Sequence, residues 1–312
     1  MSFLLPDPYP SRLDGEAKII ERADPVVHGI ADDATWLNAG QLSDFERDGY
    51  LFLPNLFTEQ DVETLRVELE RLRTSERVRQ SEIAITEPMS GEIRSIFAVE
   101  TVSDVFARLA ADPRLVGMTQ QILGSEVYLH QTRANLKPGF RGKEFYWHSD
   151  FETWHCEDGM PRMRALSCSI ALTDNLEFNG PLMLIPGSHK HFVQCAGRTP
   201  ANHHLTSLKK QDYGVPSDEH LTWLAAQREM VAPKGRAGSV VLFDCNTMHG
   251  SNSNITPYPR SNLFFVYNSV ENALEDPFAA ESARPWFLAN RTPSALTAAP
   301  FLSGAKNELA HV

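Results

Sequence analysis

The chain has 312 residues, enough to bury a full hydrophobic core in one large domain or two smaller ones. Its formal net charge of −11 argues against nucleic acid and membrane as partners, because both carry negative charge that an acidic surface repels. It contains no apolar run long enough to span a bilayer and no signal-peptide pattern, and its four cysteines lack C-x-x-C spacing. We therefore expect a cytoplasmic protein with free thiols, a composition that suits a soluble enzyme.

The first third of the chain is predicted to be mainly helical. Residues 1–40 hold several prolines and mixed charges, and we expect them to form an N-terminal arm packed on the core. A capping-box pattern opens one helix at Thr58, and apolar residues then recur at spacings of three and four. Helices are predicted over 42–49, 58–73 and 102–123, the last interrupted near Pro113, with a strand over 50–54.

After about residue 125 short apolar runs alternate with Gly, Pro and Asn, which is typical of strands. Helices followed by many short strands predict a mainly β fold with flanking helices, a double-stranded β-helix (jelly-roll) core over 41–312 with a helical buttress at about 41–124. A polar excursion over 187–233, partly helical near 218–228, is either a functional lid or disordered. The strands are predicted at about 126–137, 144–150, 164–173, 181–185, 239–243 and 261–268.

The run Phe145-Tyr-Trp-His148-Ser-Asp150 suggests a metal site. On a strand, residues two apart point to the same face, so His148 and Asp150 would present an imidazole and a carboxylate side by side. His249 follows a second strand-like run. Two histidines and one carboxylate on one face of a metal are the ligand set of non-heme Fe(II) oxygenases. Zinc is the chemical competitor, because it binds the same residue types.

Arg260 is a candidate partner for a substrate carboxylate. It begins the predicted strand after His249 and shares a face with Asn262 and Phe264. A guanidinium binds a carboxylate through two parallel hydrogen bonds, so Arg260 could hold the distal carboxylate of 2-oxoglutarate, and a solvent-facing arginine is the alternative.

A second predicted strand carries polar residues at every other position. This face either meets water or lines a polar ligand cavity, and the pattern leaves both open; its residues are Gln131, Arg133, Asn135 and Lys137.

The stretch Trp147-His-Ser-Asp-Phe-Glu-Thr-Trp-His155, continued through Pro161, resembles the signature of ectoine hydroxylases. These enzymes belong to the phytanoyl-CoA dioxygenase-like branch of the Fe(II)/2-oxoglutarate dioxygenases. Supporting stretches lie at 131–137, 179–189 and 243–251, and the resemblance runs from about Asp44 to Arg284. The short H-x-D and G-P-L-x-x-I-P-G-S-H elements mark only the broad superfamily, whereas the aromatic run is much more specific.

The resemblance implies roles for particular residues. Iron would be held by His148, Asp150 and His249, and 2-oxoglutarate and O2 would be the cosubstrates. A cationic amidine such as ectoine suits an aromatic wall, and its carboxylate suits an arginine. The resemblance implies contacts to 2-oxoglutarate by Asn135, Phe145, Ser167, Ser251 and Arg260, and contacts to ectoine by Gln131, Trp154, Phe243, Asn262, Phe264 and Arg284.

The resulting prediction is a dioxygenase that converts ectoine to 5-hydroxyectoine with release of succinate and CO2, in the metabolism of a compatible solute under osmotic stress. One alternative is the same chemistry on another small zwitterion, such as proline or another amino acid. Another is a catalytically silent jelly-roll protein that binds a solute. Halogenation would need a small residue in place of Asp150. The oligomeric state cannot be read from the sequence, and a homodimer is one open alternative.

Overall fold

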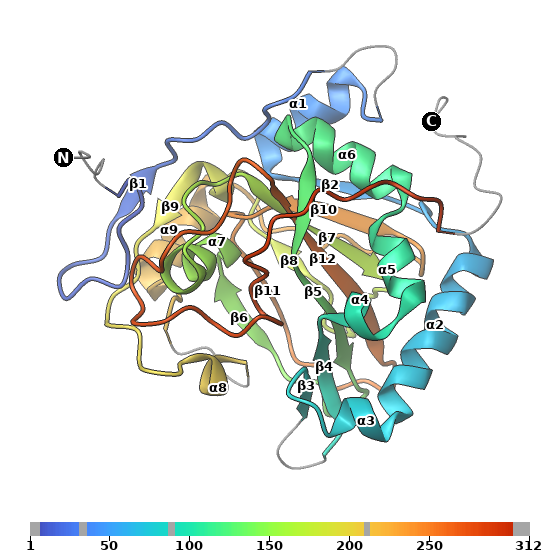
Figure 1. Ribbon diagram of the computed structural model, residues 1–312. Coiled ribbons are helices and arrows are strands. Elements are labelled where there is room, and N and C mark those ends of the chain that lie inside the picture. Colours follow the sequence, from blue (N-terminus) through green and yellow to red (C-terminus); the bar gives the residue numbers. More distant parts are fainter. Residues whose placement is uncertain (1–6, 31–35, 87–90, 209–212, 302–312) are drawn as a thin grey trace.

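The computed structural model describes residues 7–30, 36–86, 91–208 and 213–301. Its centre is a seven-stranded antiparallel sheet, whose strands are labelled in Figure 1. The long strand β12 lies in the middle of this sheet and pairs with β5 on one side and β7 on the other. Neighbouring strands follow the order β2 (Tyr50–Leu53), β10 (Val240–Asp244), β7 (Ala165–Ala171), β12 (Arg260–Ser269), β5 (Val127–Lys137), β4 (Ile93–Phe97) and β3 (Ala84–Thr86).

The two faces of the large sheet bury different kinds of side chain. Leu263, Phe265 and Tyr267 of β12 belong to the main apolar cluster, which they share with residues of the helices on that side. The residues between them, such as Asn262 and Phe264, point to the opposite face, because successive side chains of a strand alternate. One face therefore carries the hydrophobic core and the other is free to carry polar chemistry.

Helices cover the apolar face and the ends of the large sheet (Figure 1). Their ends follow local sequence signals: Thr58 caps α2 through Asp61 in a capping box, and Gly49 ends α1 with a left-handed φ of 78°. The helices are α1 (Ala39–Asp48), α2 (Glu59–Thr74), α3 (Glu76–Arg79), α4 (Val99–Val102), α5 (Asp104–Ala110), α6 (Pro113–Leu123), α7 (Asp150–Thr153), the π-helix η1 (Trp154–Asp158), the 3-10 helix η2 (Ser188–Lys190), α8 (His204–Ser207) and α9 (Asp218–Gln227). None of the described helices is long and apolar enough to cross a membrane.

A second, three-stranded antiparallel sheet lies against the polar face. It has the order β6 (Phe145–His148), β11 (His249–Ser251) and β8 (Met183–Leu184). A separate ribbon pairs β1 (Ile19–Glu21) of the N-terminal arm with β9 (His191–Val193). The predicted mainly β jelly-roll fold with flanking helices is confirmed, although across the described residues the two main sheets stay separate and do not close into one barrel.

Most of the predicted elements are present, with one consequential error. The strand predicted over 144–150 ends at His148, and the chain turns into α7 at Asp150 and into η1 at Trp154. Trp154, a predicted substrate contact, therefore lies on the π-helix and not on a strand with His148. Residues 1–6 and 31–35 of the predicted arm and 209–212 of the predicted excursion lie outside the described residues.

Candidate metal and cosubstrate site

The structure brings the three predicted metal ligands together between the two sheets. His148 ends β6, His249 begins β11, and the two residues are directly paired in the ladder. Asp150 opens α7, so its carboxylate is turned toward both rings: the His148 Nε2 lies 3.7 Å from Asp150 Oδ1 and the His249 Nε2 lies 3.9 Å from Asp150 Oδ2. One ligand atom from each residue falls within 4.8 Å of the others.

Hydrogen bonds fix both imidazoles in the orientation that a metal needs. The Nδ1–H of His148 donates to the Tyr146 carbonyl at 2.7 Å, and the Nδ1–H of His249 donates to the Thr247 carbonyl at 3.0 Å. Each Nε2 therefore carries a free lone pair directed at Asp150. The backbone carbonyls thus select the tautomer required for coordination.

The protonation states also suit coordination. Burial, reinforced by His249, lowers the pKa of His148 to about 4, so the ring is neutral at physiological pH. Burial alone would raise the pKa of Asp150, but His249, His148 and Arg133 hold it below its usual value and keep the carboxylate ionised. Two imidazoles whose Nε2 atoms face an ionised carboxylate fit the facial ligand set of Fe(II).

Two buried cations lie at one end of the β5–β12 ladder. Arg260 is directly paired with Lys137, and they are 3% and 2% exposed. The Nζ of Lys137 donates to Ser251 Oγ at 2.8 Å and to the Asn252 carbonyl at 2.5 Å. Arg260 Nε has no hydrogen-bond partner among the described residues. No carboxylate of the described chain is ion-paired with either cation, so the pair is a ready binding site for an anion.

The pKa values of Lys137 and Arg260 are both lowered, as expected for buried basic side chains that lack a carboxylate partner. Burial, with the added repulsion of Arg260 and Arg94, lowers the pKa of Lys137 to about 6. Burial and the nearby Arg133 lower the pKa of Arg260 to about 10. An anion bound between these side chains would reverse both effects, because it would stabilise the charged forms.

The other residues predicted for the cosubstrate lie around this space. The Phe145 ring lies under the guanidinium carbon of Arg94 at 4.3 Å and near Lys137 Nζ at 5.6 Å. Ser167 Oγ donates to Asp150 Oδ2 at 3.2 Å. The amide oxygen of Asn135 accepts a hydrogen bond from Ser95 Oγ at 2.8 Å, which leaves its NH2 group as a donor.

The polar face of β5 points inward, which decides between the two readings of its period-two pattern. Gln131, Asn135 and Lys137 are all buried. Arg133 stacks its guanidinium on Phe264 at 4.9 Å and forms no side-chain hydrogen bond or ion pair with the described part of the chain. Burial lowers the pKa of Arg133, and Asp150 is the main opposing charge. Arg133 is therefore a further candidate to bind an anion, and it lies closer to the metal ligands than Lys137 and Arg260 do.

The residues predicted to contact the substrate lie in different environments. Gln131 donates to the Leu288 carbonyl at 2.7 Å, and Phe243 lies 5.0 Å from the His249 ring, measured between ring centres. Asn262 donates to Ser169 Oγ at 3.0 Å, while its Oδ1 has no partner among the described residues. Trp154 is packed in an apolar cluster and meets His130 edge to face at 5.1 Å.

Arg284 is not a free arginine. Its Nε and Nη2 donate to the two carboxylate oxygens of Asp158 at 2.7 and 2.6 Å, and Asp158 is also 3.3 Å from His130 Nε2. Asp158 was not singled out from the sequence, because its partner lies far along the chain. The sequence analysis also gave no role to Arg94 and treated Lys137 and Arg133 only as one polar strand face.

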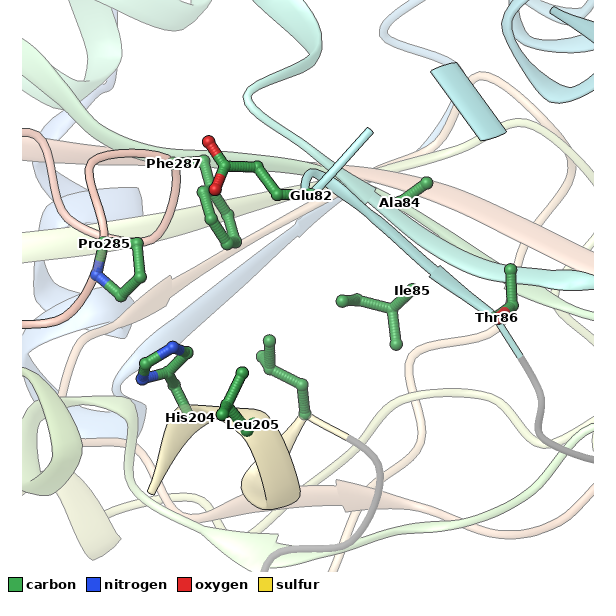
Figure 2. A pocket seen from close by; sticks show the side chains of 9 residues that line it. Glu82, Ala84, Ile85, Thr86, His204, Leu205, Pro285 and Phe287 are labelled. Carbon is green, nitrogen blue, oxygen red and sulfur yellow. The ribbon is translucent and has the colours of Figure 1, made fainter. Parts of the chain in front are cut away.

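A pocket of about 330 Å³ opens near Arg284 but does not contain the metal ligands. Figure 2 shows its side chains projecting from β3, from α8 and from the segment after Arg284. The lining is mostly apolar and comprises Glu82, Ala84, Ile85, Thr86, His204, Leu205, Leu208, Pro285 and Phe287. None of these residues was predicted to bind iron, 2-oxoglutarate or ectoine, so this pocket is distinct from the predicted site.

Comparison with known proteins agrees with this geometry. Residues 45–262 match the phytanoyl-CoA dioxygenase (PhyH) family. The chain belongs to this family. An ectoine dioxygenase from Bordetella bronchiseptica is 58% identical over 285 residues, covering 91% of this chain and 92% of the relative. A relative of the same name from Sphingopyxis alaskensis is 54% identical over 291 residues, covering 93% of this chain and 95% of the relative.

Two solved structures superpose closely on this chain. EctD from S. alaskensis, crystallised with 2-oxoglutarate and 5-hydroxyectoine, aligns with a TM-score of 0.87 at 49% identity and covers 95% of this chain and 100% of its own. A structure of the same enzyme with bound Fe aligns with a TM-score of 0.86 at 48% identity and the same coverage. The chain therefore shares the overall fold of a protein that has been observed with iron.

Proposed function

We propose that the protein is an Fe(II)- and 2-oxoglutarate-dependent dioxygenase that hydroxylates ectoine to 5-hydroxyectoine, with release of succinate and CO2. The observation that carries this function is the cluster of His148, His249 and the ionised Asp150, in a chain more than half identical to ectoine dioxygenases. The family membership supplies the chemistry, and the buried cations beside the triad supply sites for its carboxylate-bearing substrates.

The three ligands would contribute differently to metal binding. His148 and His249 would donate Nε2 lone pairs, and Asp150 would supply the negative charge. Bound Fe(II) supplies a site at which dioxygen and 2-oxoglutarate react, so that one oxygen atom ends in succinate and the other in the hydroxylated product. Ser167, by donating to Asp150 Oδ2, would leave Oδ1 as the more available oxygen for the metal.

We infer that the distal carboxylate of 2-oxoglutarate lies between Arg260 and Lys137. Both are buried and lack an ionic partner in the described chain, and Ser251 is already hydrogen-bonded to Lys137. A dicarboxylate bound there would be held by charge-assisted hydrogen bonds in a medium that excludes water. Phe145 would form an apolar wall, and the free NH2 of Asn135 would be a further donor.

Ectoine, a small cyclic amidine with a carboxylate, would occupy the end of the site nearer the aromatic residues. Phe243 and Phe264 could face its cationic ring. Its carboxylate would bind Arg133, which has no ionic partner in the described chain, or Arg284. The Nε and Nη2 of Arg284 already donate to Asp158, so the carboxylate would use the remaining Nη1. The proposed ectoine contacts are Gln131, Trp154, Phe243, Asn262, Phe264 and Arg284, with Arg133 added from the structure.

The surroundings of the enzyme are part of the proposal. We propose a cytoplasmic protein without a nucleic-acid partner, which its four free, buried cysteines and its net charge of −11 support. We also propose that residues 1–40 form an arm on a single jelly-roll domain over 41–312, supported by the pairing of β1 with β9. A homodimer is the assembly to test by size measurement in solution.

The test is mass spectrometry of the anaerobically reconstituted protein given Fe(II), 2-oxoglutarate, O2 and ectoine. We expect a product heavier by one oxygen atom and an equal amount of succinate. Proline and other small zwitterions run in parallel test the same chemistry on another substrate. Binding of 2-oxoglutarate without succinate would identify the silent binding protein instead, and preferred turnover of another zwitterion would reassign the substrate.

A further inference from the structure

The short helical segment that begins at the metal ligand Asp150 contains an unusual number of buried acidic residues. The segment α7–η1 runs from Asp150 to Asp158 and includes a π-helical turn, a feature that often occurs at functional sites. Asp150 at its start faces the two histidines, and Asp158 at its end holds Arg284. Between them Glu152 and Glu157 are 1% and 2% exposed. Neither glutamate has been given a role so far.

One arginine of the N-terminal arm neutralises both glutamates. Arg12 Nε donates to Glu152 Oε1 at 2.7 Å and its Nη2 donates to Glu152 Oε2 at 2.9 Å, which is a two-pronged ion pair. The same Nη2 lies 3.1 Å from Glu157 Oε1. His203 donates its Nδ1–H to that Glu157 oxygen at 2.8 Å, and Ser11 Oγ donates to Glu152 Oε1 at 2.8 Å. The side chain of Arg12 is completely buried.

The chain is shaped to bring this arginine in. Arg12 has a left-handed backbone with φ 59°, a conformation that residues with a side chain rarely adopt. At Gly214 a Cβ would fall 2.4 Å from Glu152 Oε2 and 2.5 Å from Arg12 Nη2, so the backbone there closes directly over the ion pair. Burial would lower the pKa of Arg12, but Glu152 raises it above its usual range. These features indicate that the backbone at Arg12 and at Gly214 is adapted to this buried ion pair, and that the arm is not packed loosely on the surface.

We propose that Arg12 is a positioning residue for the hydroxylation: by holding Glu152 and Glu157 it fixes the α7–η1 segment, so that Asp150 meets the metal and Asp158 meets Arg284 in a fixed relative geometry. This inference rests on the proposed function. Without Arg12 two carboxylates would be buried without their cation, and the segment would have to shift or take in water to relieve them. Since Asp150 is its first residue, a shift of the helix moves the ligand.

The test compares Arg12→Met with Arg12→Lys and with Arg114→Met as a matched control. Arg114 of α6 forms a pair with the buried Asp112, which caps the start of that helix away from the metal ligands, so its loss reports the general cost of breaking such a pair. Three quantities are measured on each protein: Fe(II) affinity under anaerobic conditions, the ratio of succinate to hydroxylated product, and the thermal midpoint.

We expect Arg12→Met to bind Fe(II) about tenfold more weakly, as for other outer residues that orient metal ligands. It should also release more succinate than hydroxylated product, because a displaced segment misaligns the substrate end. Arg12→Lys keeps the charge but not the two parallel hydrogen bonds. Its Fe(II) affinity and product ratio should therefore lie between those of the parent protein and of Arg12→Met. Arg114→Met should lower the thermal midpoint while leaving Fe(II) affinity and the product ratio as in the parent protein.

Unchanged Fe(II) affinity and an unchanged product ratio in Arg12→Met would overturn the proposal, whatever the thermal midpoint does. Equal changes in Arg12→Met and Arg114→Met would overturn it too. If Arg12→Met does not fold, Arg12→Lys is judged by the same two readouts. Fe(II) affinity does not depend on which substrate is turned over, so failure of the parent protein to hydroxylate ectoine would count against the proposed function and not against the role of Arg12.

Discussion

The buried ammonium of Lys137 should make 2-oxoglutarate binding depend on pH. Its pKa of about 6 means that about half of the protein carries a charged Lys137 at pH 6 but only about 1% at pH 8. The groups that act on it are Arg260 and Arg94, which disfavour the charged form together with burial, and Glu144, which favours it. The distal carboxylate of 2-oxoglutarate is ionised throughout this range, so binding favours the protonated amine.

The magnitude follows from the fraction of protein that is ready to bind. If the carboxylate is held by the charged form, the apparent Kd rises as that fraction falls, by about 50-fold between pH 6 and pH 8. The sign is set by the direction of the pKa shift: the free protein has lost the proton at pH 8 and must regain it on binding, so affinity falls as pH rises. His148, with a pKa of about 4, does not titrate in this window.

Calorimetry of 2-oxoglutarate binding to the Fe(II) protein without oxygen measures both parts of this prediction. We expect the Kd to rise toward pH 8 and about one proton to be taken up per ligand at that pH, read from the dependence of the heat on the buffer. Lys137→Met should bind weakly and without this pH dependence. A flat profile in the parent protein, or the same slope in Lys137→Met, would refute the reasoning and leave Arg260 as the sole cation of the site.

Three further outcomes test the site. Alanine at any one of the three metal ligands should remove stoichiometric iron by elemental analysis while the circular dichroism stays that of a folded protein; a full iron site in any of these variants would mean that a ligand is misassigned. Arg260→Gln should raise the KM for 2-oxoglutarate about thirtyfold or more, since truncating a buried charge pair costs about 2–5 kcal/mol; an unchanged KM would move the anchor elsewhere. Arg284→Ala should lower ectoine hydroxylation more than succinate release, and adding Asp158→Asn should restore the thermal midpoint but not hydroxylation; equal loss of both activities would give Arg284 a purely structural role.

The strands were predictable because their burial is decided locally. Strand β12 contains the unbroken apolar run Leu263-Phe-Phe-Val-Tyr267, which predicts a buried strand, whereas only the structure shows that Leu263, Phe265 and Tyr267 face the helices and Phe264 the polar side. Helix ends were equally local, because a cap and a left-handed glycine lie within a few residues of the turn that they close.

The error at residues 149 and 150, where the predicted strand gives way to the helix α7, has a physical cause. The aromatic run from Phe145 to Trp154 has the composition of a strand, and nothing within it indicates a π-helical turn. The acids that stabilise the helix in place are neutralised by Arg12 and Arg284, which come from opposite ends of the chain. Spacing within the segment could not show these partners. The pairing of His148 with Asp150 was thus anticipated from strand geometry that the protein does not use.

The same limit applies to the cations of the site. Lys137 and Arg260 are recognisable as polar residues in strands, but only the register of β5 against β12 shows that they are paired and that no carboxylate neutralises them within the described chain. Arg133 became a candidate for the same reason, since its stacking on Phe264 requires that register. A sequence can indicate which side chains carry charge, whereas the absence of a counterion is a property of the whole fold.

The β5–β12 ladder orders the two halves of the reaction along one line. Its cross-strand pairs run from Arg260 with Lys137, through Asn262 with Asn135 and Phe264 with Arg133, to Val266 with Gln131, and each step of two residues advances about 6.6 Å. The metal ligands are tied to both ends of this row: Ser167, which donates to Asp150, lies opposite Val266, and Ser251, two residues after His249, accepts a hydrogen bond from Lys137. The residues proposed for the two substrates therefore alternate along one ladder, with Arg260 and Asn135 for the cosubstrate and Asn262 and Phe264 for ectoine, so we expect a change on the ectoine side to affect 2-oxoglutarate binding as well.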